Sequence, residues 1–330
     1  MTALPIVLAV LALHWLPQVS SSKAGLRGVS IASQEVAWVS GTKGTVLRTV
    51  DAGRHWNPIK VPGAEALDFR DVTAFDQNRA LILASGPGDA SRVYRTEDGG
   101  HVWTLALSNP EKTGFFDAMK FWDRRNGILL GDAVAGRFTI YTTGNGGVTW
   151  SRAEGPAALD GEGAFAASGT CLAVLGKQNA WFGSGGIAGA RVFRTADGGQ
   201  SWSASLTPLA GGAASAGIFS VAFRDAQHGL ATGGDYRKPA ETAHVLASTS
   251  DGGKTWVASS GPGGFRSAVS YLKPAKIWIA VGTSGSDYSL DGGATWKTIS
   301  SDNLNAFAGY GTSSWAVGPA GLIVKLALQP

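Results

Sequence analysis

The sequence predicts an all-β fold: a single seven-bladed β-propeller, a ring of seven four-stranded antiparallel sheets. Three observations predict it. One eight-residue phrase recurs six times, its copies lie 40 to 54 residues apart, and 47 of the 330 residues are glycine, which indicates many turns. Short apolar or alternating segments lie between the turns, as antiparallel strands require, and no sustained helical period is present.

The recurring phrase has Ser or Thr first, Asp or Asn two residues later, Gly two after that and Trp three further on. Its copies are TVDAGRHW from Thr49, TEDGGHVW from Thr96, TGNGGVTW from Thr143, TADGGQSW from Thr195, TSDGGKTW from Thr249 and SLDGGATW from Ser289. An Asp or Asn side chain accepts hydrogen bonds from the backbone N–H groups after it, and glycine adopts positive φ without steric cost. We therefore interpret the central residues as structural turn residues without a catalytic role: Asp51, Asp98, Asn145, Asp197, Asp251 and Asp291.

The tryptophan of each copy begins the next expected strand. A large flat side chain at a fixed place in every repeat is most simply a wedge between neighbouring sheets, and each such wedge buries on the order of 200 Å². The expected wedges are Trp56, Trp103, Trp150, Trp202, Trp256 and Trp296.

A seventh, shorter unit completes the count. Its segment WAVGPAGLIVKL from Trp315 matches WVSGTKGTVLRT from Trp38, but the unit stops after its third strand and lacks the phrase. Because a ring must join its ends, we expect a segment just after residue 21 to add the missing fourth strand. Deleting residues 22–30 is then expected to lower the melting temperature.

The N-terminal residues indicate export. From Leu4 to Leu16 the chain is almost wholly apolar, and Val19 and Ser21 are placed for signal-peptidase cleavage after Ser21. We therefore divide the chain into a signal peptide or N-terminal anchor over residues 1–21 and a propeller over residues 22–330. The mature protein is expected to be periplasmic or extracellular, monomeric and without a transmembrane span, although the lack of Lys or Arg before the apolar run leaves an uncleaved anchor open.

The charges and the cysteine exclude some functions. The 28 basic and 24 acidic residues are spread along the chain without a Lys/Arg block, so nucleic acid is not an expected partner. The single Cys171 lies in an apolar run and is interpreted as a small buried residue. No cofactor is expected, because no dinucleotide fingerprint occurs in a βαβ setting, and the histidines show no metal-ligand spacing, although calcium in acidic loops stays open.

The phrase S/T-x-D-x-G-x-x-W is the Asp-box, or BNR repeat, of sialidases, sortilin-like receptors and related propellers. Seven such units in a chain of this length resemble the photosystem II stability/assembly factor family. The segments FWDRRNGILLGD and FRDAQHGLATGGD are similar to first-to-second strand connections of that family. The resemblance implies a seven-bladed, non-enzymatic, exported protein that acts as an assembly factor or a binding scaffold. Its partner would be a protein or peptide, including a subunit of a membrane complex.

Strand alternation places the candidate binding residues on one face. The boxed turns share one face, while second-to-third loops and inter-blade connections share the other, which is where propellers usually meet ligands. Arginines that enter the third strands of three consecutive units are candidates for a basic patch that binds a carboxylate, the alternative being strand-capping residues in solvent. The full candidate set is Arg92, Arg137, Arg191, Asp132, Asp235, Tyr236, Arg237, Lys238, Asp117 and Arg266. For the acids, turn stabilisation is an equal alternative.

Two other functions stay open. A glycoside hydrolase of sialidase or related type would take a glycan, and Asp132 with Asp235 is the candidate pair for an inverting mechanism, which needs carboxyls roughly 6.5–9.5 Å apart. The Arg-Ile-Pro phrase near a sialidase N-terminus is absent, and the tyrosines lack a convincing partner. The second alternative is a scaffold domain with no dedicated pocket.

Overall fold

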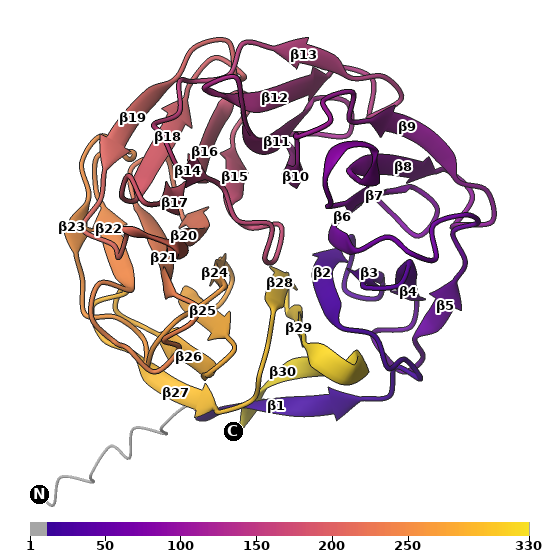
Figure 1. The fold of residues 1–330 in the computed structure, drawn as a ribbon. Helices are drawn as coiled ribbons and strands as arrows, with labels where there is room; N and C mark the ends of the chain where they lie inside the picture. Colours follow the sequence, from indigo (N-terminus) through magenta and orange to yellow (C-terminus); the bar gives the residue numbers. More distant parts are fainter. Residues whose placement is uncertain (1–11, 330) are drawn as a thin grey trace, which may run out of the picture.

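The computed structural model describes residues 12–329 and confirms the all-β fold, with seven antiparallel sheets arranged in a ring around one centre (Figure 1). Each blade runs from an inner strand near the centre to an outer strand at the rim. In residues 12–329 the helical elements are the short 3₁₀ turns η1 (Gly88–Ala90) and η2 (Pro319–Gly321). Neither of them, nor any other described segment, is a helix that could cross a membrane.

The first three blades follow one another in sequence, each in the strand order inner to outer. Blade 1 contains β2 (Leu26–Ile31), β3 (Ala37–Gly41), β4 (Thr45–Thr49) and β5 (Asn57–Ile59). Blade 2 contains β6 (Phe69–Ala74), β7 (Ala80–Ala84), β8 (Arg92–Thr96) and β9 (Thr104–Ser108). Blade 3 contains β10 (Phe116–Phe121), β11 (Gly127–Val134), β12 (Arg137–Thr143) and β13 (Ser151–Ala153).

The next three blades keep this order, with one addition. Blade 4 contains β15 (Leu172–Leu175), β16 (Asn179–Gly183), β18 (Arg191–Thr195) and β19 (Ser203–Leu206). Blade 5 contains β20 (Ala213–Phe223), β21 (Gly229–Asp235), β22 (Leu246–Thr249) and β23 (Val257–Ala258), and its sheet is extended by the short strands β17 (Gly185–Gly186) and β14 (Glu162–Gly163). Blade 6 contains β24 (Ala268–Leu272), β25 (Ile277–Gly282), β26 (Gly285–Ser289) and β27 (Lys297–Ser300).

Blade 7 is built from both ends of the described chain. It contains β28 (Ala306–Tyr310), β29 (Ser313–Val317), β30 (Ile323–Gln329) and, as its outer strand, β1 (Ala12–Gln18). The expectation that an N-terminal segment completes this blade is confirmed, but its position is corrected. The closing strand lies before residue 21, within the segment interpreted as a signal peptide, while residues 22–30 lead into blade 1. Residues 1–11 of that expected leader lie outside the described residues.

The hydrophobic core consists of seven clusters, one between each pair of neighbouring blades. Six of these clusters contain or contact a tryptophan of a boxed phrase, which stands at the start of the outer strand of one of the two blades. For blades 1 to 6 these are Trp56, Trp103, Trp150, Trp202, Trp256 and Trp296. Trp103, for example, meets Trp38 of blade 1 edge to face, with ring centroids 6.2 Å apart. Aromatic pairs of this kind add to the free energy gained from burial alone.

The boxed turns are held by one repeated set of hydrogen bonds. In the turn from Thr195, Thr195 Oγ1 accepts the N–H of Gly199 at 3.0 Å and donates to Asp197 Oδ1 at 2.6 Å. The same carboxylate accepts the N–H of Ser201 at 3.0 Å. These contacts occupy the carboxylate within its own turn, so the boxed face offers no catalytic acid at this position.

Candidate functional site

The three candidate arginines at the starts of β8, β12 and β18 do not form one basic patch. Arg137 and Arg191 line the same groove of about 460 Å³ between blades 3 and 4, together with Glu154, Pro156 and Trp202. Arg92 is not among the residues of that groove, and its guanidinium binds Asp89 of its own loop, with 3.3 Å between Nη2 and Oδ2.

Each arginine of the groove has an acidic partner. Arg137 Nη2 lies 2.8 Å from Glu154 Oε1, and this pair is open to solvent. Arg191 donates from Nε and Nη2 to the two carboxylate oxygens of Glu162, and the Nε to Oε1 distance is 2.8 Å. Burial acts to raise the pKa of Glu162, but hydrogen bonds from Arg191, Leu159 and Ser184 outweigh it and hold the pKa below its ordinary value. The groove therefore carries paired charges rather than net positive charge.

The candidates in blade 5 form a turn beside a second groove. Asp235 Oδ1 accepts the N–H of Arg237 at 2.9 Å, and this bond is the main reason that the pKa of Asp235 is lowered. Lys238 Nζ lies 3.9 Å from Glu241, and both residues line a groove of about 620 Å³ with Asp235 and His244. Tyr236 is 46% exposed and meets Phe219 edge to face. This arrangement is the turn stabilisation that the sequence left as an alternative.

Arg266 does not reach the surface. Its side chain is 2% exposed, and its Nε donates to Asp287 Oδ2 at 2.7 Å. Its Nη1 donates to the carbonyl of Phe265 and to Ser284 Oγ, both at 2.8 Å. Because these partners enclose the guanidinium, Arg266 stabilises blade 6 and cannot contact a ligand in solvent.

The structure joins two of the predicted acids to residues that the sequence analysis missed. The charges of Asp132 and Arg70 both act on Asp117. The charges of Arg70 and Asp68 both act on Arg27. These five residues are here called the mouth cluster: Arg27, Asp68, Arg70, Asp117 and Asp132. They come from the starts of the inner strands of blades 1 to 3 and from the end of β11. The cluster therefore lies near the ring centre, on the face opposite the boxed turns.

Three residues of the mouth cluster stand at strand bulges. The register between inner and second strands skips one residue in three consecutive blades, and the skipped residues are Arg27, Arg70 and Asp117. A bulged residue leaves the alternation of the strand, so its side chain points in a direction that a regular strand would not allow. The signal in the sequence is a charged residue after the first apolar residue of the inner strand, as in LRG, FRD and FDA.

Several polar atoms of the mouth cluster have no partner among the described residues. They are Arg27 Nε, Asp68 Oδ1 and Asp117 Oδ2, all buried. Burial raises the pKa of Asp117 well above its ordinary value, and the neighbouring Asp132 raises it further while Arg70 lowers it. Burial also raises the pKa of Asp132, against a hydrogen bond from the N–H of Ala164. Unpaired buried polar groups are costly, and groups with strongly shifted pKa values cluster at functional sites.

One loop of blade 4 reaches the centre of the ring beside this cluster (Figure 1). Within residues 164–170, Ala164 N–H donates to Asp132 at 2.8 Å and the Ala166 carbonyl accepts from Arg70 at 3.2 Å. Phe165 stacks on Phe219 with centroids 3.9 Å apart. Gly169 has a φ of +69°, and a Cβ there would lie 2.3 Å from Asp71 Cγ, so only glycine fits. The loop is thus fastened to the inner strands of blades 2 and 5 and to the second strand of blade 3.

The two acids of the candidate hydrolase pair have different surroundings. Asp132 is largely buried and accepts the N–H of Ala164, whereas Asp235 ends β21 and accepts the N–H of Arg237 in the following turn. In residues 12–329 no group of three or more His, Cys, Asp or Glu side chains is placed to hold a metal ion.

The described residues thus form a seven-bladed β-propeller with a partly unpaired polar cluster at the centre of one face. Its fold resembles that of YCF48 bound to D1 peptide, with a TM-score of 0.69, 17% identity and coverage of 98% of this chain and 99% of that one. YCF48 from Cyanidioschyzon merolae gives a TM-score of 0.65 at 20% identity, over 94% of this chain and 98% of that one. The fold likeness to the family named above is therefore confirmed.

The same fold also occurs in an enzyme. Virginiamycin B lyase from Staphylococcus aureus gives a TM-score of 0.68 at 11% identity, over 97% of this chain and 100% of that one. No protein-family profile and no curated protein sequence matches the chain. At these identities the likenesses establish the fold alone.

Proposed function

We propose that this protein is an exported, non-enzymatic binding propeller that acts as an assembly factor or scaffold. Its ligand is a peptide or protein segment, such as part of a membrane-complex subunit, held over the face opposite the boxed turns. The observation that carries the proposal is the mouth cluster, in which the half-buried side chains of Arg27 and Asp68 keep polar atoms without a partner among residues 12–329. A peptide supplies both donors and acceptors, so it can satisfy a guanidinium and a carboxyl together.

Exposed apolar side chains on the same face support a macromolecular partner. Leu159, Ile187 and Leu206 are 49%, 68% and 71% exposed, and all three belong to loops or strand ends of blades 3 and 4 on this face. Ile187 packs beside Gly161 and Leu206 beside Gly189, so the three side chains belong to neighbouring loops. Clustered exposed apolar side chains beside charged residues are typical of protein-binding surfaces. The peptide bound to YCF48, a protein of the same fold, supports this class of ligand.

The test is affinity capture from a detergent-solubilised extract of the native envelope. We expect the wild-type protein to retain one partner in stoichiometric amount, and Arg27→Gln and Ile187→Glu to lose it. Arg125→Gln is the matched control, because Arg125 lies in the first-to-second turn of blade 3 on the boxed face and is exposed. Capture of no stoichiometric partner, or equal capture by all variants, would contradict the proposal.

An enzyme is the second candidate, and one observation favours it: Asp117 and Asp132 are neighbouring carboxyls whose pKa values are both raised. A carboxyl with a raised pKa is suited to act as a general acid, as in glycoside hydrolases. Incubation with a glycan panel tests this. Cleavage by the wild type that is lost in Asp132→Asn would replace the binding proposal.

A further inference from the structure

We infer that the working protein retains the chain from Ala12 onward, because β1 is the closing strand of the ring. The residues that resemble the end of a cleaved signal peptide are then a permanent structural element. This inference concerns processing and is independent of which ligand the opposite face binds.

The pairing of β1 is the first evidence. All seven of its residues pair antiparallel with β30, from Ala12 opposite Gln329 to Gln18 opposite Ile323. In the other blades the outermost pair is shorter, five residues at most. The closing pair is therefore longer than any other outermost pair in the described chain, and without β1 it would leave the edge of β30 unpaired.

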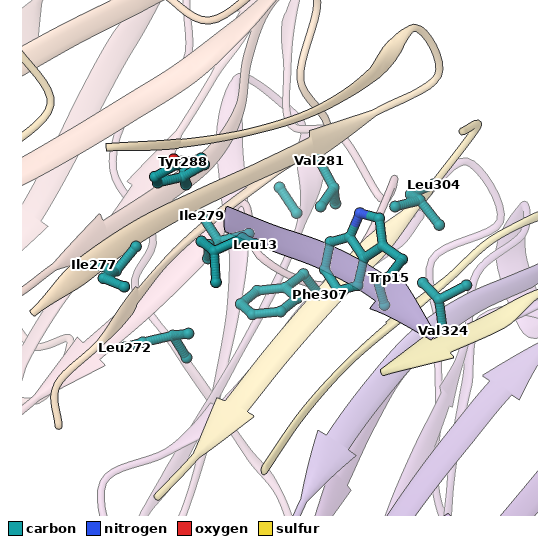
Figure 2. Close-up of a cluster of buried hydrophobic side chains, with 12 residues drawn as sticks. Leu13, Trp15, Leu272, Ile277, Ile279, Val281, Tyr288, Leu304, Phe307 and Val324 are labelled. Carbon is teal, nitrogen blue, oxygen red and sulfur yellow. The ribbon is translucent and has the colours of Figure 1, made fainter. Parts of the chain in front are cut away.

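The second evidence is Trp15, which completes the series of tryptophan wedges. Six inter-blade clusters contain a tryptophan from a boxed phrase, and the seventh, between blades 6 and 7, contains Trp15 instead. Figure 2 shows Trp15 and Leu13 on β1 among Ile279, Leu304 and Phe307. Trp15 is 9% exposed, its Nε1 donates to Ser286 Oγ at 2.8 Å, and its ring meets that of Phe307 edge to face.

The sequence also indicates that β1 is equivalent to β5, the outer strand of blade 1. His14, Trp15 and Pro17 of the segment HWLPQ match His55, Trp56 and Pro58 of HWNPI at the same spacing, and HWNPI leads into the outer strand of blade 1. The structure places the matched residues alike, because Gln18 lies against Gly53 of the next boxed turn as Ile59 lies against Gly100. Because a leader does not require residues that match a propeller strand in register, these matches indicate that the segment belongs to the propeller.

The residues around the expected cleavage site are also fixed. Ser20 Oγ donates to the carbonyl of Gly321 at 2.6 Å, and Gly321 N–H donates to Ala24 at 2.7 Å. The chain approaches η2 so closely that a Cβ on Gly321 would lie 1.9 Å from the Ser22 carbonyl oxygen. Cleavage after Ser21 would cut this turn and release β1 with Trp15.

The test compares melting temperatures of the full chain, a chain starting at Ala12 and a chain starting at Ser22. We expect the first two to agree within about 2 °C and the Ser22 chain to melt at least about 10 °C lower. Trp15→Ala should lower the melting temperature of the full chain by about 4–7 °C, while Leu16→Ala on the exposed side of the same strand changes it by less than about 2 °C. If the Ser22 chain does not fold, the comparison of Trp15→Ala with Leu16→Ala tests the inference in the full chain.

Intact-mass analysis of protein isolated from its native cells provides the independent check. We expect an N-terminus at Ala12 or earlier. An N-terminus between Leu13 and Ser22, a Ser22 chain as stable as the full chain, or equal effects of Trp15→Ala and Leu16→Ala would each overturn the inference.

Discussion

Arg266 and Asp287 form an ion pair that is almost wholly enclosed in blade 6. Nε of Arg266 lies 2.7 Å from Oδ2 of Asp287, and both side chains are 2% exposed. Thr298 Oγ1 donates to the other carboxylate oxygen at 3.1 Å. The pair joins the start of β24 to β26, so its energetics belong to the stability of the blade.

Breaking this pair from one side should be costly. Arg266→Met leaves the carboxylate of Asp287 buried and unpaired, and we expect a loss of about 3–5 kcal/mol in the free energy of unfolding. The double variant Arg266→Met with Asp287→Leu should recover most of this loss, because no buried charge then remains. Urea denaturation of the two single variants and the double variant measures the coupling. Single variants that cost less than about 1 kcal/mol would contradict this account.

The wedge role of the boxed tryptophans predicts a sharp difference between adjacent residues. Trp103 packs against Trp38 in the cluster between blades 1 and 2, whereas the preceding Val102 is 63% exposed. Trp103→Ala should cost about 3–5 kcal/mol, because the cavity opens between two blades. Val102→Ala should stay within about 0.5 kcal/mol. Urea denaturation of both variants tests the difference, because midpoints can be compared directly when the dependence of the unfolding free energy on denaturant is unchanged. Similar effects of both variants would exclude a wedge.

The sequence predicted the fold because the repeat combines local turn chemistry with a fixed spacing. Thr195, Asp197 and Gly199 form their turn through contacts within five residues, so a single copy of the phrase is enough to predict the turn. Six copies at a regular spacing then predict the blades. The position of the closing strand was predicted wrongly, because Trp15 has no boxed turn before it and lies in an apolar run that resembles a leader. Its partner strand, from Ile323, is at the opposite end of the chain.

The site was predicted only in part, since long-range contacts decide it. The loops that carry Arg137 and Arg191 are visible in the sequence, but the acids that neutralise them, Glu154 and Glu162, come from the inter-blade connection. Arg266 looked like a surface residue because nothing local shows that Asp287 encloses it. The mouth cluster depends on bulges at Arg70 and Asp117, which arise from the pairing register. Their signal in the sequence, a charged residue after the first apolar residue of the strand, is short and weak.

The boxed turns should contribute to acid sensitivity. Hydrogen bonds from the Ser201 and Thr195 hydroxyls lower the pKa of Asp197 to about 2, against an ordinary value of 3.8. Because the folded-state pKa is the lower one, the stabilisation is complete above about pH 4 and is lost as the pH falls toward 2. Asn already stands at the equivalent position 145, so Asp197→Asn keeps the turn acceptor without the titration. Melting temperatures from pH 5 to pH 2 should fall less steeply in this variant, and an unchanged slope would contradict the assignment.

Asp117 should show the opposite pH dependence. Burial raises its pKa well above 3.8, so the folded protein keeps the proton at pH values where the unfolded chain has lost it. Wild-type stability therefore falls as the pH rises above about 4, toward the folded-state pKa. Asp117→Asn mimics the neutral carboxyl and should become progressively more stable than wild type over that range, with no difference at pH 3. The matched control is Asp123→Asn, since hydrogen bonds from Asn126 and Arg125 lower the pKa of Asp123. Unfolding free energies of the Asp117→Asn and wild-type proteins that differ by the same amount at every pH would show that Asp117 is ionised in the folded state.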